Sequence, residues 1–320
     1  MDSTCIGIEI GGTKLQACIG TSGGEVLHTE QHFVPKGSEA DDILAWFEGI
    51  LPGLVRECES RGTPAQAIGV GFGGPVDSNH GTVVRSHQVS GWEGVNLRAW
   101  FHERSGGLPV VVANDANAAG WAEYQRGAGR GSRSFIYSNI GSGIGGAIIV
   151  DGRLHDGQGQ GAAEFGHTIV PDFSSDSPNA LDRLENLCSG WAIESRLHEF
   201  EYVDPVLPLG QLCGGDASQL TCRDLGAAAQ ADDPIALAEV QRVARTVGFA
   251  IANAITLIAP EVVAIGGGVS LIGEPLFTPL REAIEEFVFP PYRNSFRVEQ
   301  AVLGEQVVLV GALLLAAEGA

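Results

Sequence analysis

Three separated glycine turns are the features of this sequence that most suggest chemistry. Gly11-Gly12-Thr13-Lys14 joins two expected strands, while Gly141-Ser142-Gly143 and Gly266-Gly267-Gly268 each follow an expected strand. Because glycine has no Cβ, the backbone amides of such turns can approach an anion closely. Each turn alone is also compatible with an ordinary tight turn. Three of them at strand ends predict a nucleotide held across a cleft mainly by backbone groups.

Two stretches also match the dinucleotide fingerprint GxGxxG, at 69–74 and 141–146. In that fingerprint a helix starts directly after the loop and places its N-terminal amides on the pyrophosphate. Here a turn at 75–79 follows the first stretch and a strand at 147–150 follows the second, which argues against a nicotinamide or flavin site. The turn at 11–14 is not a P-loop either, because a strand rather than a helix is expected from Leu15 onward.

The composition is that of a globular protein with an unusual amount of glycine. Glycine makes up 45 of the 320 residues, about twice its usual share, but without the Gly-X-Y period of collagen. The chain is 44% hydrophobic and can bury a sizeable core, and at roughly 150 residues per domain its length suggests two domains. The formal net charge of −20 would repel nucleic acid and anionic membrane surfaces, so neither is an expected partner.

The chain start and the cysteines indicate a cytoplasmic protein. The first residues carry an acid where a signal peptide needs a basic region, and apolar stretches such as 247–259 are shorter than the roughly 20 residues of a membrane span. The six cysteines are scattered and form no CxxC pair. We therefore expect free thiols in a reducing compartment.

Hydrophobic periodicity predicts two α/β halves with a ligand between them. In the first half we expect strands at 5–10 and 15–20, a third strand after Gly24, a helix at 41–58 that Pro52 should kink or divide, strands at 67–72 and 109–113, and a helix at 115–126. The second half repeats this order loosely, with strands at 134–140 and 147–150, further strand up to about 170, a helix at 234–258, a strand at 262–265, a helix at 275–287, and a final strand and helix. The expected hinge lies near residues 113–116.

The order and spacing of six segments resemble the ROK family (repressor, open reading frame, kinase) of sugar kinases, within the actin and hexokinase superfamily. The segments are GIEIGGTK at 7–14, GFGGPVD at 71–77, NDANAA at 114–119, GSGIGG at 141–146, EFGH at 164–167 and IGGGVS at 265–270. The resemblance implies an α/β fold of two RNase H-like (actin-like ATPase) domains with the active site in the cleft between them. The implied domains are residues 1–113 with about 303–320, and residues 114–302.

This resemblance also implies an activity, the transfer of the γ-phosphoryl group of Mg-ATP to a hydroxyl of a hexose. Glucose is the first expectation; fructose, mannose and an N-acylhexosamine stay open, as does polyphosphate as donor. A homodimer is also implied. ATP would be bound by the three glycine turns, namely Gly11, Gly12, Thr13, Lys14, Gly141, Ser142, Gly143, Gly266, Gly267 and Gly268.

Asp115 is the candidate catalytic base. In isolation it is better explained as the N-cap of the helix that follows; the resemblance implies that it accepts the proton of the sugar hydroxyl. The ordinary Asp pKa of about 3.9 would make it a weak base, which suffices because phosphoryl transfer needs little early proton removal. The implied sugar-binding residues are Gly74, Asn114, Glu164, His167 and Glu185, the last placed by the Ser189-Gly190 that follows it.

Two departures from the family pattern stand out. The family's first motif usually begins with an Asp that reaches the magnesium shell, whereas this chain has Glu9, which we expect to act on the metal through bound water. Many members carry three zinc-binding cysteines, whose positions here become Asp176, Pro178 and Arg183. None of these supplies a thiolate, so no structural zinc is expected.

Two other functions compete with a kinase. Family regulators carry a DNA-binding helix-turn-helix before the first glycine hairpin, and here only ten residues precede Gly11. The residue Glu9 and the missing cysteines also leave open a non-catalytic sugar- or nucleotide-binding protein.

Overall fold

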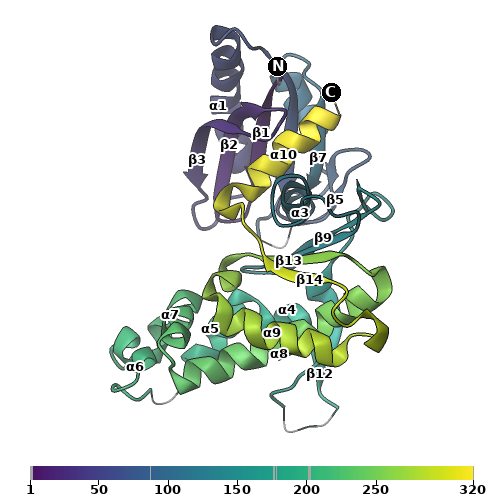
Figure 1. Ribbon diagram of the computed structural model, residues 1–320. Coiled ribbons are helices and arrows are strands. Elements are labelled where there is room, and N and C mark those ends of the chain that lie inside the picture. Colours follow the sequence, from purple (N-terminus) through teal and green to yellow (C-terminus); the bar gives the residue numbers. More distant parts are fainter. Residues whose placement is uncertain (1–2, 87, 176, 178, 201–202, 320) are drawn as a thin grey trace.

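The structure is a computed structural model that describes residues 3–86, 88–175, 177, 179–200 and 203–319. Figure 1 shows two layered α/β units, one above the other, each built on a five-stranded sheet. All six cysteines lie in the described residues and are free thiols. Among the helices of the described residues, none is both long and apolar enough to span a lipid bilayer.

The first sheet has the strand order β3-β2-β1-β4-β7. Its strands are β1 (Thr4–Ile10), β2 (Lys14–Thr21), β3 (Val26–Phe33), β4 (Ala65–Phe72) and β7 (Val110–Asn114). The first three are antiparallel neighbours, whereas β4 and β7 run parallel to β1. The helices packed on this sheet are α1 (Ala40–Ser60), α2 (Leu97–Arg104) and α10 (Val307–Glu318).

Side chains of strand β1 are buried against helices on both faces of this sheet. Successive side chains of a strand point to opposite faces. Ile6 and Ile8 are buried in the core that contains α1 and α2, whereas Cys5 is buried with Leu309 and Leu313 of α10. The end of the chain therefore packs against its beginning (Figure 1).

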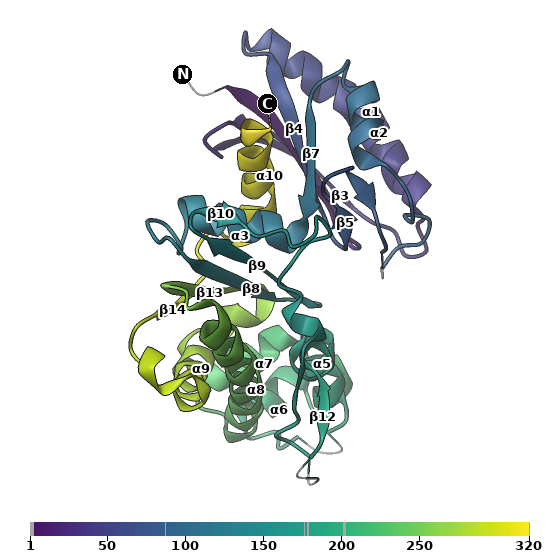
Figure 2. The ribbon, with the colours of Figure 1, turned by 90° about the vertical axis from the view of Figure 1, so that its right-hand side faces the viewer.

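The second sheet repeats this topology, as the sequence predicts. Its order is β10-β9-β8-β13-β14, with three antiparallel neighbours followed by two parallel strands. The strands are β8 (Phe135–Ile140), β9 (Ile144–Val150), β10 (Arg153–Leu154), β13 (Val262–Gly266) and β14 (Arg297–Gln300). The long helices α8 (Pro234–Ile258) and α9 (Glu274–Phe287) cover one face, and α3 (Asp115–Arg126) covers the other (Figure 2).

Short elements complete the second unit. They are β11 (Ile169–Pro171), β12 (Leu181–Arg183), α4 (Leu184–Cys188), α5 (Gly190–His198), α6 (Pro208–Cys213) and α7 (Cys222–Gln230), with the ribbon β5 (Val76–Asp77) and β6 (Thr82–Val83) beside the first sheet. Helices α4 to α7 have no more than nine residues each, too short for a clear helical period in the sequence.

Helix α1 excludes one of the two effects expected of Pro52, because the proline does not divide it. The helix is continuous over Ala40–Ser60 with Pro52 inside. Pro52 lies on the exposed side, while Leu51 and Leu54 stay buried on the face toward the sheet. Burial of that apolar face outweighs the loss of one helical hydrogen bond.

The chain passes between the two sheets twice. The first crossing is α3, which follows β7 of the first sheet and precedes β8 of the second. The second is the segment 301–306, which leads from β14 to α10. Figure 2 shows α3 and α10 next to each other between the sheets, and the two helices are in extensive contact.

Candidate active site

A cavity of about 350 Å³ lies between the two sheets. Its wall is formed by Glu9 of β1, Asp115 of α3, Tyr137 and Asn139 of β8, and Gly266–Gly268 at the end of β13. Strands β8 and β13 are parallel, with Gly266 paired to Asn139, so their carboxyl ends open at the same edge. The cavity thus brings together the predicted base, the predicted metal carboxylate and one of the three glycine turns.

Asn114, rather than Asp115, caps helix α3. The Asn114 Oδ1 accepts hydrogen bonds from the backbone amides of Ala116 at 2.9 Å and Asn117 at 3.1 Å. Its Nδ2 donates to the Gly74 carbonyl at 3.2 Å, which joins two predicted sugar-binding residues directly. The explanation of Asp115 as an N-cap is therefore wrong.

Asp115 is the first residue of α3 and keeps one carboxylate oxygen available. Its Oδ1 accepts a hydrogen bond from the Ala116 amide at 2.8 Å. Its Oδ2 lies toward Gly73, where a Cβ would come within 3.5 Å of this oxygen. A glycine at that position keeps a side chain away from this oxygen.

Burial changes the acidity of Asp115. Loss of solvation raises the pKa of Asp115 to about 6; the Ala116 amide opposes this rise, and the nearby charge of Glu164 adds to it. The ordinary value used in the sequence analysis therefore underestimates its strength as a base. A carboxylate with this pKa is still mostly ionised at neutral pH and accepts a proton more readily.

Glu9 is an unpaired acceptor beside this carboxylate. Its Oε2 is buried and has no hydrogen-bond partner. Burial is the largest cause that raises the pKa of Glu9 to about 7; Lys14 lowers it, and the charges of Asp115 and Glu305 raise it further. An orphaned carboxylate oxygen next to other acids fits a hard cation such as Mg²⁺.

Glu9 would not hold such a cation on protein ligands alone. Within the described part of the chain, no three His, Cys, Asp or Glu side chains come close enough to form a metal site. Mg²⁺ commonly keeps several waters and is bound by one or two carboxylates together with substrate phosphates. The unpaired carboxylate of Glu9 therefore fits a metal that arrives together with a nucleotide.

The first glycine turn connects β1 and β2 but does not line the cavity. The Gly11 amide donates to the Lys14 carbonyl at 3.1 Å, and the Val34 amide donates to the Thr13 carbonyl at 2.9 Å. The Gln88 side chain lies directly on Gly12, where a Cβ would overlap it. Gln88 belongs to no motif, so no signal in the sequence places it at this turn.

The second glycine turn is closed by backbone hydrogen bonds and braced by Glu185. The Gly141 amide donates to the Gly143 carbonyl at 2.9 Å, and the Gly190 amide donates to the Gly141 carbonyl at 2.7 Å. The Glu185 Oε2 accepts a hydrogen bond from the Ile144 amide at 2.9 Å. Glu185, a predicted sugar-binding residue in α4, thus also braces the predicted ATP loop.

The third glycine turn lies beside the second. Gly267 has φ +83°, and a Cβ there would overlap the Ile140 carbonyl at the end of β8. This close approach needs glycine. The cavity wall includes Gly266, Gly267 and Gly268 but none of 11–14 or 141–143, so only one of the three turns reaches it directly.

The remaining sugar candidates lie around a short 3₁₀ turn, Phe165–His167. Glu164 and His167 are exposed, and the Leu184 amide donates to the Thr168 carbonyl at 2.9 Å, which ties this turn to α4. A Cβ at Gly166 would come within 3.2 Å of the Glu185 Cβ. The ribbon β11–β12 therefore brings the 164–167 turn next to Glu185.

Aromatic contacts hold the outer end of this ribbon. Phe173 stacks on Phe287 with ring centroids 5.8 Å apart and meets Phe249 edge-on at 6.2 Å. The Arg245 guanidinium lies 4.9 Å from the Phe173 ring centroid and 5.0 Å from that of Phe287. Of the positions matching the family's zinc cysteines, Arg183 ends β12 with an exposed side chain, while Asp176 and Pro178 lie outside the described residues.

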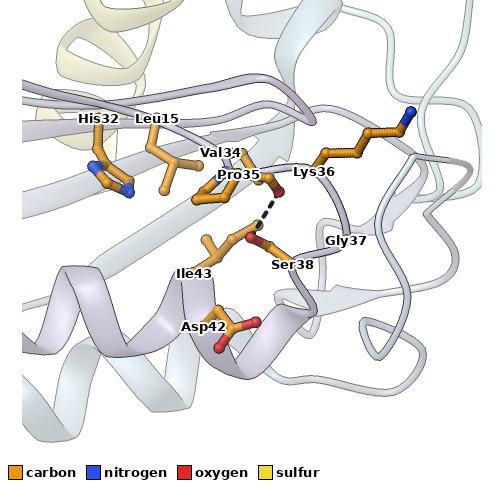
Figure 3. A pocket seen from close by; sticks show the side chains of 9 residues that line it. All are labelled: Leu15, His32, Val34, Pro35, Lys36, Gly37, Ser38, Asp42 and Ile43. Atoms are coloured by element: carbon orange, nitrogen blue, oxygen red, sulfur yellow. Dashed lines mark hydrogen bonds between the residues drawn. The ribbon is translucent and has the colours of Figure 1, made fainter.

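A second cavity of about 340 Å³ lies between the end of β3 and the start of α1 (Figure 3). Leu15 and Ile43 contribute apolar walls, and the Ser38 hydroxyl donates to the Pro35 carbonyl at 2.8 Å. In Figure 3 the Lys36 side chain extends away from Leu15 and Ile43. Apart from Leu15, which follows the first glycine turn, this cavity is separate from the predicted site.

Two sheets of matching order with a cavity between them define an actin-like ATPase fold, as the sequence predicts. The model of the ROK family matches residues 5–319, and the chain belongs to this family. A glucokinase from Streptomyces coelicolor is 33% identical over 319 residues, covering 98% of this chain and 97% of the relative. A glucokinase from Thermotoga maritima is 32% identical over 310 residues, covering 96% and 95%.

A solved structure agrees with these relatives. The crystal structure of a ROK family glucokinase from Streptomyces griseus in complex with glucose and AMPPNP has a TM-score of 0.82 and 33% identity, covering 99% of this chain and 100% of that one. These similarities confirm the predicted enzyme class, a kinase. The role of each site residue stays a prediction.

Proposed function

We propose that this protein transfers the γ-phosphoryl group of Mg-ATP to a hydroxyl of a hexose, with glucose as the first substrate to test. The observation that carries the proposal is the position of Asp115. This carboxylate, with its pKa raised to about 6, lies in one cavity with the Gly266–Gly268 turn and the unpaired Glu9 carboxylate. A base, an anion-binding turn and a metal-directed carboxylate are the parts that phosphoryl transfer needs.

Asp115 would accept the proton of the attacking hydroxyl through Oδ2. Its Oδ1 is bound to the Ala116 amide, which fixes the carboxylate at the start of α3. Asn114 holds the Gly74 carbonyl, so both residues would form the floor under the sugar. Glu164, His167 and Glu185 would bind the remaining hydroxyls, which is why the set is polar.

The glycine turns would bind ATP through backbone amides. Gly266–Gly268 already line the cavity; 11–14 and 141–143 would complete the site when the two halves close. Mg²⁺, when bound with ATP, neutralises charge on the transferring group. Glu9 would hold this metal through bound water. We propose that residues 1–113 with 303–320 form one closing half and 114–302 the other.

Glucose is preferred because glucokinases are among the similar proteins, at 32–33% identity over nearly the full chain. Fructose, mannose or an N-acylhexosamine as substrate would need different hydroxyl contacts from the same residues. We expect the active form to be a cytoplasmic homodimer.

A coupled assay of ADP release over a panel of hexoses with Mg-ATP tests the proposal. We expect sugar-dependent turnover that is lost in Asp115→Ala, with glucose giving the highest kcat/KM. Sugar binding by calorimetry without turnover on any sugar would instead identify a non-catalytic binding protein. Sequence-specific DNA binding that a sugar releases would identify a regulator.

A further inference from the structure

Glu123 is a buried carboxylate for which the proposed reaction has no use. It lies on α3, the helix that begins with Asp115, and its side chain is 0% exposed. Among the residues that the structure describes, no Lys, Arg or His forms an ion pair with it. Burying a carboxylate is costly unless hydrogen bonds replace its water.

Three backbone amides replace that water, two from the connector 301–306 and one from the chain just after α3. The Glu123 Oε1 accepts hydrogen bonds from the amides of Val302 and Leu303, each at 2.8 Å. Its Oε2 accepts one from the Ala128 amide at 2.9 Å. Val302 and Leu303 belong to the connector 301–306, and Ala128 lies where the chain leaves α3 for β8.

The main chain of Glu123 strengthens its attachment to the segment 127–129. Its carbonyl accepts hydrogen bonds from Gly127 at 3.0 Å and Gly129 at 2.9 Å. A Cβ at Gly127 would overlap the Glu123 Oε2. The segment 127–129 is therefore wrapped around this one residue, and glycine at 127 makes the close approach possible.

Glu123 also shares a helix face with the proposed base. Asp115, Ala119 and Glu123 are spaced by four residues, and all three line the cavity between the sheets. The connector that Glu123 binds contributes Gly304 and Glu305 to the same cavity. One carboxylate thus links the helix of the base to the opposite wall of the cavity.

We propose that Glu123 is a positioning residue: it fastens the connector 301–306 and the segment 127–129 to α3, so that Asp115 and the cavity wall at 304–305 stay aligned when the two halves close on substrates. This proposal rests on the proposed kinase function. Charge-assisted hydrogen bonds to three amides suit this role, because they are stronger than neutral ones and hold two segments on one side chain. Glu123 acts through Asp115 and the connector, and it touches no reacting atom.

The test compares Glu123→Gln with the matched control Glu318→Gln. Glutamine keeps one acceptor oxygen for the amides of Val302 and Leu303, but its NH₂ group faces the Ala128 amide, which is also a donor. The variant therefore keeps the attachment of the connector 301–306 and removes that of the segment 127–129. Glu318 is an exposed residue at the end of α10, the helix that packs on α3, so the control makes the same change on this helix pair away from the connector 301–306 and from the segment 127–129.

We expect Glu123→Gln to lower kcat at least tenfold and to raise the KM for ATP, measured well below its melting temperature. The Kd for the sugar alone should stay within twofold of wild type. Amide hydrogen exchange should be at least tenfold faster in peptides covering 126–130 or 300–306, whereas Glu318→Gln should match wild type in all three measurements. Val302→Pro, at an exposed position, deletes one donor and supplies a second, milder variant if Glu123→Gln does not fold.

Wild-type kinetics in a folded Glu123→Gln, with only a lower melting temperature, would overturn the positioning role and leave a purely structural one. Unchanged exchange in both segments would overturn it equally. A wild-type protein without sugar-dependent turnover would instead overturn the proposed function. The exchange measurement, which needs no turnover, still tests the attachment of the two segments in that case.

Discussion

The Glu185 carboxylate accepts a hydrogen bond from the backbone amide of Ile144 at 2.9 Å, directly after the glycine turn 141–143. A Cβ at Gly143 would approach the same Oε2 to 2.7 Å. A side chain predicted to bind sugar therefore also fixes a loop predicted to bind ATP. We therefore expect sugar binding and loop geometry to be coupled through this residue.

This coupling predicts different results for two substitutions of Glu185. Glu185→Gln keeps an acceptor for Ile144 and should raise mainly the KM for the sugar. Glu185→Ala leaves the Ile144 amide without its partner, a loss of about 1–3 kcal/mol, and should raise the KM for ATP as well by roughly tenfold. Steady-state kinetics with each substrate varied in turn measures this. Equal effects of the two variants on the KM for ATP would refute the prediction that Glu185 fixes the 141–143 turn.

The raised pKa of Asp115 predicts the acid limb of the pH profile. The base works when deprotonated, so kcat/KM should fall as the pH drops through about 6, the pKa of this carboxyl in the folded protein. Asp115→Asn should lower kcat by about 10²–10⁴-fold, because the amide cannot accept the proton. A pH series of initial rates at saturating Mg-ATP checks both points. An acid limb near pH 4 would show that burial does not raise this pKa.

Much of the fold and part of the site are predictable from sequence, and the contrast has physical reasons. Helix α8 and helix α3 match their predicted bounds because each has an Asx residue just before or at its start, and α8 also has a clear apolar face. The position of Gln88 against Gly12 depends on a contact between segments far apart in the chain. The same holds for the hydrogen bonds that join Glu123 to the connector 301–306. Local patterns carry no information about such contacts.

The positive φ of Gly267 predicts a stability difference between two neighbouring glycines. A Cβ at Gly267 would overlap the Ile140 carbonyl, and its φ of +83° alone costs alanine about 1–2 kcal/mol. Gly268 has open space at the same position and no positive φ. Gly267→Ala should therefore lower the free energy of unfolding clearly, whereas Gly268→Ala should stay within about 0.5 kcal/mol of wild type. Denaturant unfolding of both variants makes the comparison, and similar losses would contradict it.

The aromatic cluster around Phe173 predicts that the ribbon β11–β12 depends on packing and needs no zinc. Metal analysis of chelator-washed protein should find well under one zinc per chain. Phe173→Ala removes the contacts of the Phe173 ring with Phe287 and with Arg245. This substitution should loosen the ribbon that joins the 164–167 turn to Glu185. We expect a several-fold higher KM for the sugar with the KM for ATP unchanged. One stoichiometric zinc would refute the prediction that the ribbon needs no metal. An unaltered KM for the sugar would refute the role of Phe173 packing.

The buried, unpaired carboxylate of Glu9 predicts opposite effects on stability and on metal dependence. Its pKa rises from 4.5 to about 7 on folding, so the folded protein binds more protons than the unfolded chain between these values. Stability should therefore fall as pH rises through this window, and the full cost of the charge is present above about 7. Glu9→Gln removes that cost and should stabilise the nucleotide-free protein at pH 8 by on the order of 2 kcal/mol, but barely at pH 5.

The same substitution should weaken catalysis, because the amide that replaces the carboxylate attracts a cation and its water less strongly. We expect Glu9→Gln to need several-fold more magnesium for half-maximal rate at fixed ATP. Thermal unfolding at both pH values and magnesium titrations of the rate provide the two measurements. A variant that is more stable at pH 8 but unchanged in turnover and magnesium dependence would keep the burial argument and remove Glu9 from the metal shell. A variant with no stability gain at pH 8 would contradict the buried, unpaired state of this carboxylate.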